Sequence, residues 1–211
     1  MGKINKKQAL IFGTSLSFFS VIALDYFANT ISAALLLFTI LFYVFVYTIW
    51  LKRKTPQNIV IGGAAGALPP VIGWTIATNS LSLEPITFFL IIFFWTPSHF
   101  WALSLYKSDD YKKAKIPMLP LTNGIESTKI NILVYSLLMM PMVILPYAID
   151  FVGLVFLIPA LMLTLYYNFL CFELYMYKKN KFNPKKAKTI FGYSILYLFL
   201  IFVIFLIDKI L

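Results

Sequence analysis

The chain has 211 residues, of which 61% are hydrophobic and 12% are charged, a composition that excludes an ordinary soluble domain. Its single cysteine, Cys171, excludes an internal disulfide and lies among leucine and phenylalanine residues, which predicts a buried packing role. The formal net charge of +10 fits either nucleic acid or a membrane surface as a partner, and the distribution of the bases decides between the two.

Apolar runs of about 20 residues recur along the chain, as transmembrane helices require. They predict an all-α fold, a polytopic integral membrane helical bundle that forms one domain over residues 1–211. The predicted spans, with ends assigned to within about 2–4 residues, are Ala9–Phe27, Ile31–Leu51, Ile59–Ala77, Leu83–Tyr106, Ile130–Ile149, Val152–Tyr177 and Ile190–Ile207.

The basic residues fall on alternate connections between these spans. They comprise Lys3, Lys6, Lys7, Lys52, Arg53, Lys54, the lysines of residues 107–115, Lys129 and the lysines of the predicted turn at residues 178–188. Only Lys209 lies on the other side. The positive-inside rule therefore predicts a cytoplasmic N-terminus and an outside C-terminus, in a bacterial inner membrane or, as the second choice, a mitochondrial one. Because no basic face on a folded domain remains, a nucleic-acid partner is excluded.

The end of the second predicted span carries a tyrosine followed by three bases. Bases at the inner membrane face are ordinary topology signals, and this explanation stands beside a functional one. Tyr47 lies five residues before Lys52, so its hydroxyl is expected about one and a half turns deeper on a similar side of the helix. Lys52 and Arg53 would then offer a point charge and a planar fork to phosphate oxygens, which makes them a candidate anion clamp.

Glycine and proline punctuate the third predicted span, at Gly62, Gly63, Gly66, Pro69, Pro70 and Gly73. Gly62 and Gly66 are four residues apart and Gly73 continues nearly the same face, so another helix is expected to approach closely. The two prolines remove two backbone donors, which a span tolerates where it faces protein or a wet cavity. Helix packing and a cavity-lining role both remain open.

The fourth predicted span carries the only histidine, His99, among Trp95, Phe100 and Trp101. It lies about two turns, on the order of 10 Å, from the cytoplasmic end of the helix. A histidine at hydrocarbon depth is either a hydrogen-bonded structural residue or part of a functional cavity.

The loop after this span mixes acids, lysines and Tyr111. Asp109 and Asp110 would form an ordinary solvated turn, but the apolar insert at residues 116–120 suggests that the loop folds back onto the membrane surface. A carboxylate, a tyrosine hydroxyl and lysines near one mouth suit a magnesium–diphosphate ligand, because Mg²⁺ is usually held by one or two carboxylates and phosphate oxygens.

Four segments carry a resemblance to a known family: residues 47–70, Thr96–Leu105, Asp110–Pro120 and Ala187–Leu198. They resemble the heme O synthases, the protoheme IX farnesyltransferases of the UbiA superfamily of intramembrane prenyltransferases. The resemblance covers essentially the whole chain. The Pro/Gly-rich span and the run from His99 to Leu103 resemble the heme enzymes in particular.

The resemblance implies transfer of a farnesyl group from farnesyl diphosphate, bound with Mg²⁺, to a vinyl group of protoheme IX (heme b), giving heme O for terminal oxidases. Lys52 and Arg53 would hold the diphosphate, Lys107 and Tyr111 would be nearby donors, and His99 would belong to the heme cavity. The implied site comprises Asp110, Tyr111 and Lys52 for catalysis; Arg53, Tyr47, Asn58, Lys107 and His99 for substrate binding; and Asp110 with Asp109 for the metal. The implied partners are both substrates, the lipid bilayer, and heme A synthase or terminal oxidase assembly proteins.

One departure from the family pattern concerns the N-terminal part. The family has nine helices and a first aspartate-rich motif between helices two and three, whereas residues 2–10 resemble the segment before helix three. We therefore expect an N-terminally truncated copy without that motif, and an apolar groove beside the first two spans. An inactive remnant or a non-catalytic partner in oxidase assembly stays an alternative.

A transporter is a weaker alternative, because no internal repeat is evident and intramembrane charges are few. Glu173 is the main such charge, and snorkelling towards Lys178 is its simplest explanation.

Overall fold

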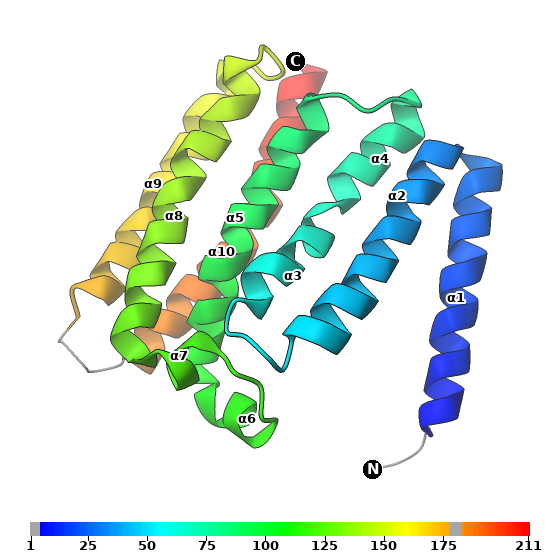
Figure 1. The fold of residues 1–211 in the computed structure, drawn as a ribbon. Coiled ribbons are helices and arrows are strands. Elements are labelled where there is room, and N and C mark those ends of the chain that lie inside the picture. The colour runs from blue at the N-terminus through cyan, green and yellow to red at the C-terminus, as the bar shows by residue number, and fades with distance from the viewer. Residues whose placement is uncertain (1–4, 178–182) are drawn as a thin grey trace.

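A computed structural model describes residues 5–177 and 183–211, and all regular secondary structure in these ranges is helical (Figure 1). Lys3 and the lysines at positions 178–181 lie outside the described residues. The elements are α1 (Lys6–Phe27), α2 (Thr30–Leu41), the π-helix η1 (Phe42–Leu51), α3 (Asn58–Ala67), α4 (Pro69–Thr78), α5 (Glu84–Tyr106), α6 (Ser108–Lys113), α7 (Leu119–Thr122), α8 (Gly124–Ala148), α9 (Leu154–Tyr175) and α10 (Pro184–Ile210).

Within the described ranges, seven helical stretches are long and apolar enough to cross a membrane. They are α1, α2 with η1, α3 with α4, α5, α8, α9 and α10. These stretches confirm the all-α class and the seven predicted spans. The short helices α6 and α7 lie between α5 and α8 and were not predicted.

The helix α5 occupies the centre of the molecule. It packs against α3, α4, α8 and α10, and α9 completes the cluster by packing on α8 and α10. The helix α1 lies at the edge, beside α2 (Figure 1), and buries none of its residues. An apolar groove of about 750 Å³ lies between α1 and the α2–η1 stretch, where a groove was expected.

Hydroxyl pairs join the core helices to one another. The Ser98 hydroxyl of α5 lies 2.9 Å from that of Tyr167 in α9, and the Thr164 hydroxyl of α9 lies 3.0 Å from that of Tyr197 in α10. Among apolar surroundings such pairs satisfy polar groups that have no water to bind and so favour one register between helices. Cys171 is fully buried, as predicted.

Two predicted helix starts were wrong. The helices α8 and α10 begin six residues before the predicted Ile130 and Ile190. In α10, the Asn183 side chain accepts a hydrogen bond from the Lys185 amide at 3.0 Å, and Pro184 occupies the first helical position, where its missing N–H costs nothing. Hydropathy detects only the apolar part of a helix and misses such charged first turns.

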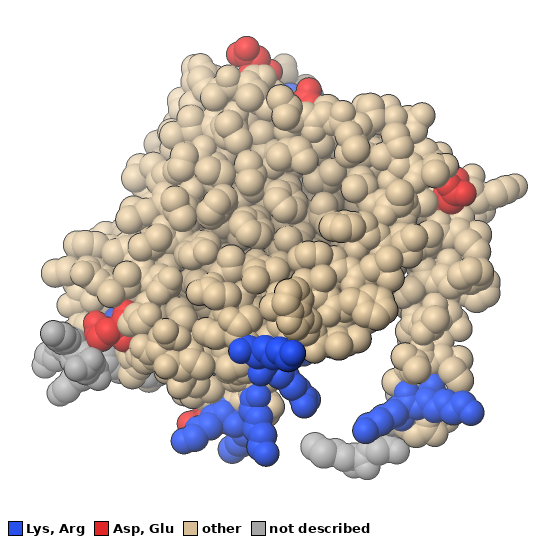
Figure 2. All heavy atoms as spheres, viewed as in Figure 1, with Lys and Arg blue, Asp and Glu red and all other residues tan. Residues whose placement is uncertain are grey.

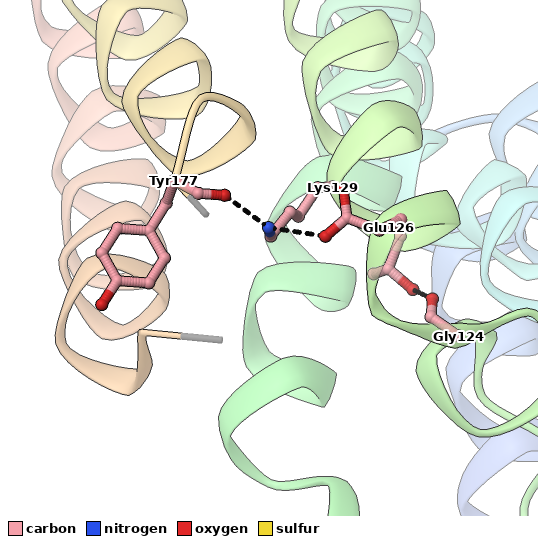
Figure 3. Close-up of polar contacts among 5 residues, drawn as sticks. Gly124, Glu126, Lys129 and Tyr177 are labelled. Carbon is pink, nitrogen blue, oxygen red and sulfur yellow. Dashed lines mark hydrogen bonds and ion pairs between the residues drawn. The ribbon is translucent and has the colours of Figure 1, made fainter. Parts of the chain in front are cut away.

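Lys129 was also predicted wrongly, as a loop base. It lies in α8 and is fully buried, and its Nζ atom lies 2.8 Å from Glu126 Oε1 and 2.9 Å from the Tyr177 carbonyl oxygen (Figure 3). Lys129 therefore ties the start of α8 to the residues that follow α9. A buried ammonium group is tolerated only with such partners.

Candidate functional site

Most of the bases gather at one end of the bundle (Figure 2). We call this the basic end; it is formed by the turn at residues 52–57 and the loop between α5 and α8, residues 107–123. Its bases are Lys52, Arg53, Lys54, Lys107, Lys112, Lys113 and Lys115. The start of α1 lies at the same end, whereas the end of α10, whose last turn carries Lys209, lies at the other (Figure 1). The alternate connections thus bring their charges to one side of the molecule.

A cavity of about 310 Å³ lies between η1, α3, α5 and α10. This volume is at the lower limit of the roughly 300–1,000 Å³ typical of small-molecule sites. Its walls are mostly aromatic and aliphatic, and one face consists of glycine. The lining residues are Tyr43, Tyr47, Ile59, Gly62, Gly63, Gly66, Ile92, Trp95, Thr96, Phe100 and Leu198.

The glycines of α3 serve both purposes that the sequence left open. Gly62 and Gly63 permit close packing, because a Cβ at Gly62 would come within 2.9 Å of three atoms of the Tyr47 ring and one at Gly63 would meet Thr96 at 3.0 Å. At Gly66 and Gly73 an added Cβ would meet nothing within 4 Å. The close helix approach expected at Gly62, Gly66 and Gly73 is therefore found at Gly62, and the expectation was wrong for Gly66 and Gly73. Gly66 instead lines open space.

The prolines of the third span divide it into two helices. Pro69 and Pro70 begin α4, and Leu68 forms the junction with α3. A proline ring cannot continue the preceding hydrogen-bond ladder, so α3 ends where the prolines begin.

Tyr47 joins the cavity to the basic end. Because η1 is a π-helix, the Lys52 amide donates to the Tyr47 carbonyl at 2.8 Å, five residues back. The Lys52 ammonium lies 5.7 Å from the centroid of the Tyr47 ring, within the range of a cation–π interaction. Tyr111 of α6 lies near enough to Tyr47 to influence its ionisation. Tyr47 and Lys52 therefore lie together where the cavity faces the basic end, with Tyr111 from a distant part of the sequence nearby.

The acids predicted for the metal lie in the first turn of α6. Asp109 and Asp110 are exposed, and Asp110 Oδ2 lies 3.4 Å from the Lys107 ammonium. Burial raises the pKa of the neighbouring Tyr111 hydroxyl, and Tyr106 and Asp110 add to the shift. Tyr111 therefore stays protonated, and able to donate a hydrogen bond, through the neutral pH range.

The loop beyond α6 folds back onto the helices α5 and α8; its expected contact with the membrane surface stays a prediction. Met118 and Leu119 of the apolar insert are 1% and 3% exposed, and α7 packs on α5 and α8. This packing holds α6, with its two acids, close to the end of α5.

Asn58 and Arg53 flank the turn after η1. Arg53 is exposed. Asn58 is 1% exposed, and its Nδ2 group donates to the Thr55 carbonyl at 2.6 Å. Its Oδ1 atom is buried with no hydrogen-bond partner among the described residues. A buried acceptor in that state costs free energy until a donor meets it, so Asn58 is a candidate contact for a ligand group that donates a hydrogen bond.

A metal ion would depend on few protein ligands here. The described residues contain no group of three or more His, Cys, Asp or Glu side chains that could hold one. Asp109 and Asp110 fit the weaker pattern of Mg²⁺, which keeps several waters and binds one or two carboxylates together with substrate phosphates.

His99 lies beside the cavity rather than in it. Its ring is stacked between Trp95 and Phe191, at centroid distances of 4.2 and 4.6 Å. Its Nδ1 atom lies 2.6 Å from the Ser194 hydroxyl, and the Trp95 Nε1 donates to the Ser194 carbonyl at 2.9 Å. Trp95 lines the cavity, and His99 itself lines an adjacent apolar hollow of about 320 Å³ that shares Trp95 and Leu198 with the cavity.

Sequence reasoning missed part of the cavity wall. Trp95 was noted only as a neighbour of His99. Tyr43 lies four residues before Tyr47, outside the segment of residues 47–70 that was considered. Leu198 comes from α10, and nothing in its local sequence distinguishes it from the other apolar residues of that helix.

Glu173, the main charge within a predicted span, forms an ion pair with a lysine other than the expected Lys178. Its carboxylate lies 3.1 Å from the Lys186 ammonium of α10, whereas Lys178 lies outside the described residues. The ion pair explains the acid without a transport role.

Comparisons with known proteins agree with this architecture. Residues 1–200 match the UbiA prenyltransferase family. The chain is 96% identical over 211 residues to a protein named protoheme IX farnesyltransferase from Pelagibacter ubique (strain HTCC1062), and covers 70% of that protein. It is 49% identical over 210 residues to one of the same name from Parvibaculum lavamentivorans, and covers 66% of it. The chain thus spans about two thirds of the length of these relatives.

One solved structure has the same fold. It comes from work on digeranylgeranylglyceryl phosphate synthase in membranes, and superposes with a TM-score of 0.80 at 16% sequence identity. The match covers 98% of this chain and 71% of that one. At this identity the likeness extends to the fold alone.

Proposed function

The chain belongs to the UbiA prenyltransferase family, and from this premise we propose that it transfers a farnesyl group from farnesyl diphosphate to a vinyl group of protoheme IX. The observation that carries the proposal is the 96% identity, across all 211 residues, with a protein named protoheme IX farnesyltransferase. The same identity favours an enzyme over a non-catalytic assembly partner.

The basic end supplies the diphosphate site in this proposal. Lys52 and Arg53 bind the phosphate oxygens, and Lys107 and Tyr111 donate from the opposite side of the mouth. The nearness of Tyr111 to Tyr47, and of Tyr47 to Lys52, supports such convergence. As the allylic C–O bond breaks, the diphosphate leaves with the electron pair, and fixed positive groups stabilise the charge that develops on it.

Asp110 and Asp109 would hold Mg²⁺ together with the diphosphate. The ion, when bound, neutralises charge on the departing phosphate oxygens. Tyr111 remains a neutral donor beside these carboxylates because its pKa is raised. Asn58 contacts the substrate where the turn meets α3. Its unpaired buried Oδ1 atom is an acceptor, so it pairs with a donor there and not with a phosphate oxygen.

The apolar cavity receives the farnesyl group and keeps water away from the reactive carbon. The allylic carbon bonds to the outer carbon of the vinyl group of heme b. A water oxygen then bonds to the inner carbon, where the positive charge is left, and loses a proton, which gives the hydroxyethylfarnesyl side chain. His99 acts as a positioning residue, because its ring and its bond to Ser194 hold Trp95 in the cavity wall.

The seven apolar helices fit a multi-pass membrane protein. We propose a bacterial inner-membrane location with the basic end in the cytoplasm, where anionic lipid headgroups favour it. Heme A synthase or oxidase assembly proteins would receive the product.

The test is heme O formation from heme b, farnesyl diphosphate and Mg²⁺ in membranes that contain the protein. Lys52→Ala and Arg53→Ala should raise the KM for farnesyl diphosphate about tenfold or more, because a charged hydrogen bond contributes about 1.5–3 kcal/mol. Lys54→Ala, one residue away, should change it little. Undiminished heme O formation by Asp110→Ala would contradict the metal assignment, and no heme O from the wild type would contradict the function.

A further inference from the structure

Two glycines on the same face of α3 line the cavity in different ways. Gly62 and Gly66 are one helical turn apart, and both contribute to the cavity wall. At Gly62 the space that a side chain would occupy is filled by the Tyr47 ring, whereas at Gly66 it is empty to 4 Å. Gly62 therefore seats a cavity residue, and Gly66 keeps part of the cavity vacant.

Gly66, an exposed residue, lies at the end of the cavity farther from the basic end. The helix α3 begins at Asn58, at the basic end, and Gly66 follows eight residues later, roughly 12 Å along the axis. Gly62, and with it Tyr47, lies about 6 Å nearer the mouth. On the facing helix α5, Ile92 and Phe100 show the same order, since Phe100 is closer to the end of α5 at the basic side.

A chain bound by its diphosphate at the basic end would extend along this wall towards Gly66. We propose that Gly66 determines how long an isoprenoid chain the site accepts, by leaving open the far end of the cavity. The inference rests on the proposed function, because it assigns the cavity to the apolar tail of the diphosphate substrate. A larger side chain at position 66 would occupy the space of the terminal isoprene unit.

The experiment is equilibrium binding of radiolabelled farnesyl diphosphate to the protein in membranes, with competition by geranyl diphosphate, which is one isoprene unit shorter. Gly66→Leu should weaken farnesyl diphosphate at least about tenfold, since even one misplaced methylene in an apolar pocket costs about 10–200-fold. Geranyl diphosphate should retain its affinity, so that the preference between the two ligands reverses. Gly66→Ala should give a smaller change in the same direction.

Gly73→Leu is the matched control. Gly73 lies on α4 of the same span and has equally open surroundings, but does not line the cavity. It should keep the wild-type preference. Both substitutions replace glycine by a better helix former, so the variants are expected to fold.

The outcomes separate this inference from the proposed function. Equal weakening of both ligands in Gly66→Leu, or an unchanged preference, would overturn the inference while leaving the diphosphate site intact. A wild-type protein that binds neither ligand would overturn the proposed function, and the inference with it.

Discussion

Tyr47 contacts both halves of the candidate site: its ring lies against Gly62 in the cavity wall, and the Lys52 ammonium lies 5.7 Å from the centroid of the same ring. A substitution at Gly62 that moves the Tyr47 ring should therefore also move the Lys52 ammonium. The sequence indicated that Tyr47 and Lys52 belong together, but not that Gly62 is what allows the ring its place. That requirement depends on the packing of η1 against α3.

Gly62→Ala tests this coupling. The added methyl group would overlap the Tyr47 ring, and relief of such overpacking costs about 1–3 kcal/mol. The ring should move and shift Lys52, so binding of farnesyl and geranyl diphosphate should weaken together. Gly66→Ala, one turn away, should disturb the longer ligand more than the shorter one. Wild-type binding of both ligands by Gly62→Ala would show that Tyr47 does not position Lys52.

Lys129 gives a second prediction at this scale. Lys129→Met should lower the free energy of unfolding by about 1–3 kcal/mol, because the Tyr177 carbonyl and the partly buried Glu126 carboxylate lose a donor. Lys113→Met, at an exposed position of α6, should have little effect. Thermal unfolding in detergent measures both, and equal melting temperatures for Lys129→Met and wild type would contradict a stabilising role.

Among the elements, the apolar middle of each span was predictable and its ends were not. Hydrophobic length predicted all seven stretches, because the hydrocarbon thickness sets that length. The starts of α8 and α10 depend instead on caps and buried pairs made by Asn183 and Lys129. The π-helix η1 leaves no mark in the hydrophobic pattern. The sequence suggested a cavity only along the glycines of α3. It could not show that α10 also lines the cavity, because that contact depends on tertiary packing.

A contact between two helix ends provides the prediction at this scale. The Asp208 carboxylate, near the end of α10, accepts hydrogen bonds from the Gly153 and Phe156 amides at 3.0 Å each. It thereby caps the start of α9, where unpaired amides and the helix dipole favour an anion.

Asp208→Ala should therefore destabilise the protein by about 1–3 kcal/mol. Asp208→Asn should lose less, because one acceptor oxygen remains. Asp25→Asn, at an exposed position in α1, serves as the control. The free energy of unfolding measured in detergent would contradict the cap if Asp208→Ala matched the control.

At the scale of the whole molecule, the charges define a direction. Lysines from both halves of the sequence, together with Arg53, lie at the basic end, with α1 and α10 beginning on the same side (Figures 1 and 2). The other end carries Asp25, Asp150 and Asp208, with Lys209 as its base among the described residues. Such asymmetry sets the orientation of a membrane protein. A diphosphate site at the basic end then opens to the cytoplasm.

Cysteine labelling tests this orientation directly, because the native Cys171 is fully buried and should give a low background. Ser80 and Asn123 are exposed at opposite ends of the bundle. In intact spheroplasts, a membrane-impermeant maleimide should label Ser80→Cys and should label Asn123→Cys only after permeabilisation. The opposite pattern would reverse the orientation. It would also move the proposed diphosphate site away from the cytoplasm, since Lys52 and Tyr111 lie at the same end as Asn123. Both substitutions remove small polar side chains from surface turns, so neither should disturb the packing that holds the cavity together.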